Sequence, residues 1–119
     1  MNPDELKTRT KKYGLEIIRM TESLPTTRTA SVITNQLLRS GTSVGANYRA
    51  ACRARSRADF ASKACIAIEE ADETMYWLEL LLEAGIVPKD RLSALMEEAN
   101  ELIAILTAYV KTARANLKK

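Results

Sequence analysis

The chain has 119 residues, of which 46% are hydrophobic and 28% charged, with three prolines, four glycines and no histidine. This length fits one domain with a single core, and the composition favours a folded, helix-rich protein. The lack of histidine removes the commonest general base and the commonest metal ligand, and no glycine-rich phosphate loop is present. We therefore expect a non-enzymatic protein without metal or cofactor, organised as one domain over residues 1–119.

The chain carries no predicted membrane segment. Its most apolar run, residues 75–87, is too short to span a bilayer and contains two glutamates. The first twelve residues lack the apolar centre of a signal peptide. Cys52 and Cys65 have no C-x-x-C spacing and are interpreted as reduced thiols, with a disulfide as the less favoured alternative. A cytoplasmic protein that does not contact membranes is expected.

Charge is segregated along the chain although the net charge is only +3. Residues 1–63 carry twelve basic and five acidic side chains, a net +7, and residues 64–110 carry two basic and ten acidic ones, a net −8. Residues 111–119 add four basic side chains. Such a layout indicates a surface directed at an anionic partner, or basic helices held against acidic ones.

The first predicted helix follows Asn2, a suitable N-cap, and opens with Pro3 in its first turn. Pro25 ends it, because the residue before a proline is disfavoured in the helical conformation. Its apolar residues recur at steps of three, four and seven and form one core-facing stripe. The stripe comprises Leu6, Tyr13, Ile17, Met20 and Leu24.

A second helix is predicted to begin near Thr26 or Thr27 and to end before the turn at residues 55–59. Its inward positions are Ala30, Ile33, Leu37, Gly41, Val44, Tyr48 and Ala51. Gly41 and Gly45 lie on one face, where a neighbouring backbone can approach closely or where the helix can break.

Asn47 is the unusual polar residue of this small-residue segment. A buried amide needs hydrogen-bond partners, and Glu69, Asp72 or Thr74 of the next helix could supply one. We expect Asn47 to be structural and to fix the register between helices.

Two further helices complete the chain. Ser56 caps the third, with Asp59 completing a capping box, and Gly85 ends it. The inner stripe of the third helix is Ala61, Ala64, Ile68, Ala71, Met75, Leu78 and Leu82. Pro88 begins the fourth, whose stripe is Leu92, Leu95, Ala99, Leu102, Leu106, Tyr109, Ala113 and Leu117. Four amphipathic helices with short connections predict an all-α fold, an antiparallel up-down four-helix bundle.

The third helix has more apolar surface than a lone bundle buries. Phe60, Trp77, Leu80 and Leu81 lie off its inner stripe. Monomeric soluble proteins rarely expose an apolar strip of that size. We expect a homo-oligomer with these four residues at the subunit contact; the alternative is that the strip packs under the end of the first helix.

Two carboxylates of the third helix have a spacing that suits metal ligands. Glu69 and Glu73 are four residues apart and can share a face. Metal-binding bundles usually add a Glu-x-x-His pair, which a chain without histidine lacks. A solvated acidic face, or ion pairs with a neighbouring helix, is therefore the favoured interpretation.

A cluster of arginines forms the best candidate binding surface. It comprises Arg49, Arg53, Arg55 and Arg57. Lys7 and Lys11 form a second basic pair one helical turn apart. Guanidinium groups suit phosphate, and no aromatic residue is interleaved, so the pattern favours contact with the backbone of RNA or DNA without base readout. The alternative is a solvated surface with ion pairs across the bundle.

Four ordered segments carry a family resemblance: residues 40–49 (SGTSVGANYR), 55–60 (RSRADF), 69–74 (EEADET) and 76–81 (YWLELL). The chain resembles the bacterial four-helix-bundle proteins named for open reading frames in intervening sequences of 23S ribosomal RNA genes. It departs from the family pattern at Ala50, where a glutamate is usual. The resemblance implies a ring-like homopentamer without enzymatic activity. It also implies similarity to the accessory protein of diversity-generating retroelements, a basic barrel that binds nucleic acid and a reverse transcriptase.

Two functional hypotheses follow. The first is an oligomeric bundle that binds RNA or DNA through Arg49, Arg53, Arg55 and Arg57. The second is a protein-interaction scaffold, or an accessory factor for a nucleic-acid enzyme such as a reverse transcriptase, engaged through the acidic third helix.

Overall fold

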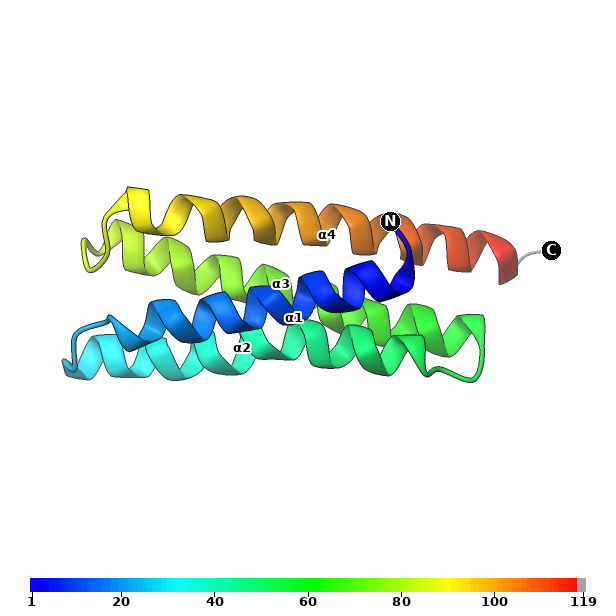
Figure 1. Ribbon diagram of the computed structural model, residues 1–119, viewed down its shortest axis with the longest axis horizontal. Coiled ribbons are helices and arrows are strands. Elements are labelled where there is room, and N and C mark those ends of the chain that lie inside the picture. The colour runs from blue at the N-terminus through cyan, green and yellow to red at the C-terminus, as the bar shows by residue number, and fades with distance from the viewer. Residues whose placement is uncertain (118–119) are drawn as a thin grey trace.

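The computed structural model describes residues 1–117 and folds them into four helices. These are α1 (Pro3–Glu22), α2 (Arg28–Cys52), α3 (Arg57–Glu83) and α4 (Lys89–Leu117). Successive helices run in opposite directions and form a rod of 52 × 21 × 20 Å (Figure 1). The predicted all-α four-helix bundle is confirmed. Lys118 and Lys119, which belong to the predicted basic tail, lie outside the described residues.

The helices begin where the capping signals predict. In α1, α2 and α3 the N-cap side-chain oxygen accepts the backbone N–H three residues on: Asn2 from Glu5 at 2.8 Å, Thr27 from Ala30 at 3.2 Å, and Ser56 from Asp59 at 3.1 Å. Each bond satisfies a backbone donor that has no partner within its own helix. The Asp59 carboxylate accepts a bond from Lys63 Nζ at 3.0 Å.

Gly85 ends α3 in the left-handed conformation, with φ of 72°. Its N–H donates to the Leu82 carbonyl at 3.1 Å, and the Ile86 N–H donates to the Leu81 carbonyl at 3.0 Å. This pair of bonds is the Schellman motif, in which a glycine avoids the steric cost of positive φ. The chain then turns back over the end of α3, where Val87 is buried.

Helix α2 is continuous through its small-residue segment. A Cβ added at Gly45 would lie 3.2 Å from the backbone carbonyl carbon of Thr10, and one added at Gly41 would lie 2.9 Å from two side-chain carbons of Ile17. Gly45 therefore allows the backbones of α1 and α2 to approach closely, as predicted, and Gly41 makes room for the Ile17 side chain, so no break is needed.

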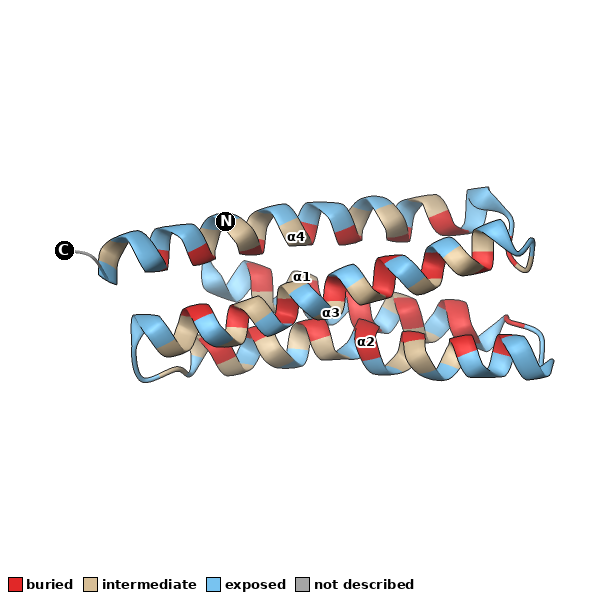
Figure 2. Cartoon of the chain, turned by 180° about the vertical axis from the view of Figure 1, so that it is seen from behind, coloured by how far each residue is buried: buried red, intermediate tan, exposed pale blue. Residues whose placement is uncertain are grey.

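The core runs along the inner faces of all four helices (Figure 2). The predicted stripes of α1 and α2 are buried throughout. In α4 the stripe shifts after Leu106, so that Val110 is buried whereas Tyr109 is half-buried and Leu117 is exposed. In α3, which packs between α2 and α4, the buried face is shifted from the predicted stripe: Ala67, Thr74 and Leu81 are buried, whereas the predicted Ile68 and Leu82 are half-buried.

Helices α1 and α4 approach each other less closely than the other neighbouring pairs do. Long side chains bridge them: Arg9 Nη2 and Nε donate to the two carboxylate oxygens of Glu98 at 2.6 and 2.7 Å, and Arg9 also contacts Glu101 at 3.2 Å. Tyr13 donates its hydroxyl to the Leu95 carbonyl at 3.2 Å. The hydrogen bond from Arg9 holds the pKa of the Glu98 carboxyl below its ordinary value.

Within residues 1–117, no helix has the length and apolar character needed to cross a membrane.

Candidate nucleic-acid interface

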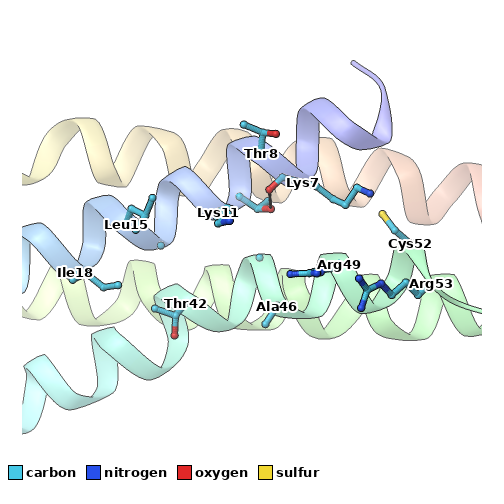
Figure 3. Close-up of a pocket in the computed structure, with 13 residues that line it drawn as sticks. Lys7, Thr8, Lys11, Leu15, Ile18, Thr42, Ala46, Arg49, Cys52 and Arg53 are labelled. Carbon is cyan, nitrogen blue, oxygen red and sulfur yellow. Dashed lines mark hydrogen bonds between the residues drawn. The ribbon is translucent and has the colours of Figure 1, made fainter.

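A groove of about 600 Å³ lies between α1 and α2 (Figure 3). Four basic side chains line it: Lys7 and Lys11 from α1, Arg49 from α2, and Arg53, the C-cap residue of α2. Each pair is separated by one turn of its helix, so both members lie on the same helix face. The structure thus brings together two basic pairs that are about 40 residues apart in the sequence.

The groove exists because its floor carries almost no side chains. Gly14 and Gly45 line it, and the Cα of Thr42 lies 3.6 Å from where a Cβ on Gly14 would stand. With the two backbones this close, the longer side chains on either side form the walls. The small-residue segment of α2 therefore determines both the helix crossing and the shape of the candidate site.

Most of these cations have no acidic partner. Lys7 contacts Asp4 at 3.1 Å. Over residues 1–117, Lys11, Arg49 and Arg53 form no ion pair. Because a concave surface concentrates the field of its charges, the groove is positioned to attract an anion.

Arg55 and Arg57 lie apart from the groove. Both are exposed at the connection between α2 and α3, beyond the last turn of α2. The four predicted arginines therefore divide into two that line the groove and two beside its Arg53 end.

The groove also has an apolar part that was not predicted from the sequence. Leu15, with 43% of its surface exposed, and the half-buried Ile18 line the end away from Arg53. Their only signal is their spacing of four and seven residues from Lys11, which places all three on the same face of α1. The groove therefore offers both charge and apolar surface to a ligand.

Asn47 does not bridge two helices, and that part of the prediction is wrong. Its Nδ2 donates to the Ser43 carbonyl of its own helix at 2.9 Å, and the side chain is only half-buried. The buried polar contact between α2 and α3 is made instead by Thr74, whose Oγ1 lies 2.9 Å from Ser40 Oγ. Both residues are completely buried.

Leu81 does not lie on an exposed strip, which corrects the predicted subunit contact at this residue. It is completely buried within the chain because α3 ends there and the following residues fold back over it. Phe60, Trp77 and Leu80 are half-buried against the core of their own chain. Their place in a subunit contact stays a prediction.

The outer surface of α3 also carries an aromatic pair. Tyr76 is 53% exposed and meets Trp77 edge to face, with ring centroids 5.1 Å apart. The Trp77 indole N–H donates to Glu73 Oε1 at 3.3 Å.

The acidic residues of α3 do not form a metal centre. Glu73 forms an ion pair with Arg39 of α2, which also contacts Glu70 at 3.1 Å. The hydrogen bond from Arg39 holds the pKa of Glu73 below its ordinary value. In the part of the chain that the structure describes, no three His, Cys, Asp or Glu side chains are grouped to hold a metal ion. Cys52 and Cys65 are both free thiols.

Comparisons with known proteins agree with this fold. A protein of unknown function from the S23 ribosomal protein family of Bacteroides thetaiotaomicron is 35% identical, with a TM-score of 0.86, and the match covers 93% of this chain and 99% of that chain. No curated protein matches. The family profile described as 23S rRNA-intervening sequence protein matches residues 5–108, which include every residue of the basic groove. The chain therefore belongs to the 23S rRNA-intervening sequence protein family.

Proposed function

We propose that this protein is a non-enzymatic, homo-oligomeric cytoplasmic bundle that binds the sugar-phosphate backbone of RNA or DNA. The observation that carries the proposal is the convergence of four cations from two helices on one groove. Three of the four have no ion-pair partner among residues 1–117. Arg55 and Arg57 extend the positive surface beyond the end of the groove.

The chemistry favours phosphate over bases. Guanidinium and ammonium groups bind phosphate oxygens with charge-assisted hydrogen bonds, and their binding releases counterions from the nucleic acid. Among residues 1–117, none of those that line the groove is aromatic. Since sequence-specific recognition of unpaired bases usually relies on aromatic stacking and base-edge contacts, we expect little sequence preference.

Fluorescence anisotropy with a labelled oligonucleotide tests this function. The double variant Arg49→Glu, Arg53→Glu should lower affinity at least tenfold in about 50 mM salt, because it removes two phosphate contacts and adds two repulsive charges. The matched control is Arg19→Glu, Arg28→Glu, which makes the same charge change at two exposed residues outside the groove. An equal loss of oligonucleotide affinity in both double variants, or no binding by the native protein, would refute the groove as the nucleic-acid site.

The proposed homo-oligomer rests on the surface of α3 and not on the groove. Trp77 and Leu80 keep part of their surface exposed beside Tyr76 on α3, and Phe60 does so near the start of the same helix, which leaves apolar area for a second subunit. Five subunits is the number that the family resemblance implies. Multi-angle light scattering at micromolar concentration should show several copies, and Trp77→Glu should shift the mass toward the monomer. A monomeric native protein would end this proposal.

A second candidate function is a scaffold for a basic protein partner such as a reverse transcriptase. It is favoured by a stripe of exposed carboxylates on α3 at spacings of three, seven and four, comprising Glu69, Asp72, Glu79 and Glu83. None of the four forms an ion pair within residues 1–117. This function requires weak affinity for nucleic acid alone and a stable complex with the partner, which the anisotropy titration distinguishes from the first.

A further inference from the structure

We infer that the α1–α2 groove accepts a single nucleic-acid strand and discriminates against a duplex; the inference rests on the proposed nucleic-acid binding. Its basis is the placement of cations on both walls of a narrow groove, Lys7 and Lys11 on one wall and Arg49 and Arg53 on the other.

The groove is narrow because the helices that form it are in backbone contact. A Cβ on Gly45 would lie 3.2 Å from both the carbonyl carbon and the carbonyl oxygen of Thr10. Each wall is therefore one helix wide, and the volume of about 600 Å³ is that of a small-molecule site, which is roughly 300–1,000 Å³. A short stretch of one phosphodiester chain fits this space and contacts both walls.

A duplex cannot use both walls in the same way. An α-helix with its side chains is about 10–12 Å across, so two helices side by side span roughly 20 Å. The major groove of B-DNA is about 12 Å wide and the minor groove about 6 Å, so neither admits the α1–α2 pair. A duplex therefore cannot take the helix pair into either of its grooves, and it meets the site with the phosphate backbone of one strand only.

The apolar end of the groove suits unstacked bases. Leu15 is 43% exposed there, and Ile18 lies beside it on α1. A strand anchored at Lys7, Lys11 and the two arginines brings its next bases toward these side chains. In a duplex the base faces are stacked inside, so only an unpaired strand gains from this apolar contact.

The salt dependence of binding gives a quantitative expectation. Four phosphate contacts on a single strand predict that log K falls with log salt with a slope of about −2.8 per subunit, from roughly −0.7 per contact. Loss of two contacts should reduce that slope to about −1.4.

Paired anisotropy titrations with labelled oligo-dT and with an oligo-dT·oligo-dA duplex of half its length, so that the two probes carry about the same number of phosphates, test the inference. At equal salt the single strand should bind at least tenfold more tightly. Lys11→Glu with Arg49→Glu should lower single-strand affinity at least tenfold while circular dichroism shows unchanged helicity. Duplex binding equal to or tighter than single-strand binding would overturn the inference and leave the proposed function standing, whereas no binding of either probe would overturn both.

A variant at the apolar end of the groove provides the second arm of the experiment. Leu15→Ser should weaken single-strand binding several-fold and leave any duplex binding unchanged. The matched control is Val32→Ser, which alters another exposed apolar residue, 56% exposed and outside the groove. Equal single-strand affinity of the two variants would show that the strand does not run over Leu15, and would overturn the inferred path of the strand.

Discussion

Ser40 and Thr74 place two hydroxyl groups 2.9 Å apart in the interior of the bundle. Each also lies within hydrogen-bonding distance of a carbonyl of its own helix, Ser40 with Gln36 at 2.9 Å and Thr74 with Glu70 at 2.7 Å. A buried hydroxyl that can bond to its own helix costs little to bury. The contact between the helices therefore adds specificity to the α2–α3 packing without requiring a larger polar side chain.

Replacement of Thr74 by valine tests this contact. Thr74→Val removes the hydroxyl at similar volume and should lower the free energy of unfolding by about 0.5–1.5 kcal/mol, because Ser40 keeps its bond to Gln36. Ser40→Ala and the double variant Ser40→Ala, Thr74→Val complete a double-mutant cycle, in which chemical denaturation measures the free energy of unfolding of each protein. Additive losses would show that the two hydroxyls do not interact.

Glycines at the α1–α2 crossing differ in how tightly they are enclosed. A Cβ at Gly41 would stand 2.9 Å from side-chain carbons of buried Ile17, whereas one at Gly14 would meet its nearest neighbour, Thr42, at 3.6 Å. Gly41→Ala should destabilise the protein by about 1–3 kcal/mol through overpacking. Gly14→Ala should stabilise it by up to about 1 kcal/mol through helix propensity. Thermal unfolding midpoints should move in opposite directions; a shift in the same direction would contradict the packing argument.

At the level of whole helices, the contact between α1 and α4 depends on polar side chains. Backbones that pack closely, as at α1–α2, need small residues, whereas the wider α1–α4 contact is bridged by Arg9 with Glu98 and by Tyr13. Burial raises the pKa of the Tyr13 hydroxyl. This contact is consequently sensitive to pH.

Acidification should weaken the contact between α1 and α4. The folded-state pKa of Glu98 lies below the ordinary value of 4.5, so its ion pair stabilises the fold above that pH, and the contribution is lost as pH falls through the lowered pKa. Glu98→Gln should cost about 1 kcal/mol at pH 7 and progressively less toward pH 3. Urea denaturation across this range measures the difference, with Glu97→Gln as the control on an exposed neighbour without an ion pair among residues 1–117. If the difference in free energy of unfolding between the native protein and Glu98→Gln did not change with pH, the stabilising role of the Glu98 ion pair would be contradicted.

The helices and most of their core residues follow from the sequence because caps, proline, glycine and apolar spacing are local signals. The position of Leu81 does not, because its burial depends on the chain folding back over the end of α3 after Gly85. Asn47 was misplaced for a similar reason, since the choice between a bond within α2 and one to α3 depends on how α2 is rotated. Local periodicity does not determine either outcome.

At the scale of the molecule, the candidate site combines what the sequence shows with what only the fold supplies. The two basic pairs are visible as residues one turn apart on separate helices. Their convergence requires the close crossing at Gly14 and Gly45. Arg55 and Arg57, grouped with the other arginines by sequence proximity, lie outside the groove because the chain leaves α2 after its C-cap residue Arg53 and enters α3 at Arg57.

Subunit association predicts that stability depends on protein concentration. The thermal midpoint of the native protein should rise with concentration, because association stabilises the folded chain. Leu80→Ala should reduce this dependence, whereas Leu81→Ala should cost about 2–5 kcal/mol at every concentration because Leu81 belongs to the core. Differential scanning calorimetry over a hundredfold concentration range measures the thermal midpoints of the native protein and of the two variants. A concentration-independent midpoint in the native protein would contradict association through α3.

One end of the rod is held together by smaller side chains than the rest. There α1 stops short of the other helices (Figure 1), and a separate cluster of Ala51, Ala61, Ala64, Val110 and Ala113 joins α2, α3 and α4. Little apolar area is buried by alanines, so this end should open without unfolding the whole molecule. Amide hydrogen exchange should be faster at residues 57–65 and 107–113 than in the middle of the same helices. Because Arg53, Arg55 and Arg57 adjoin this end, a bound polyanion should slow that exchange.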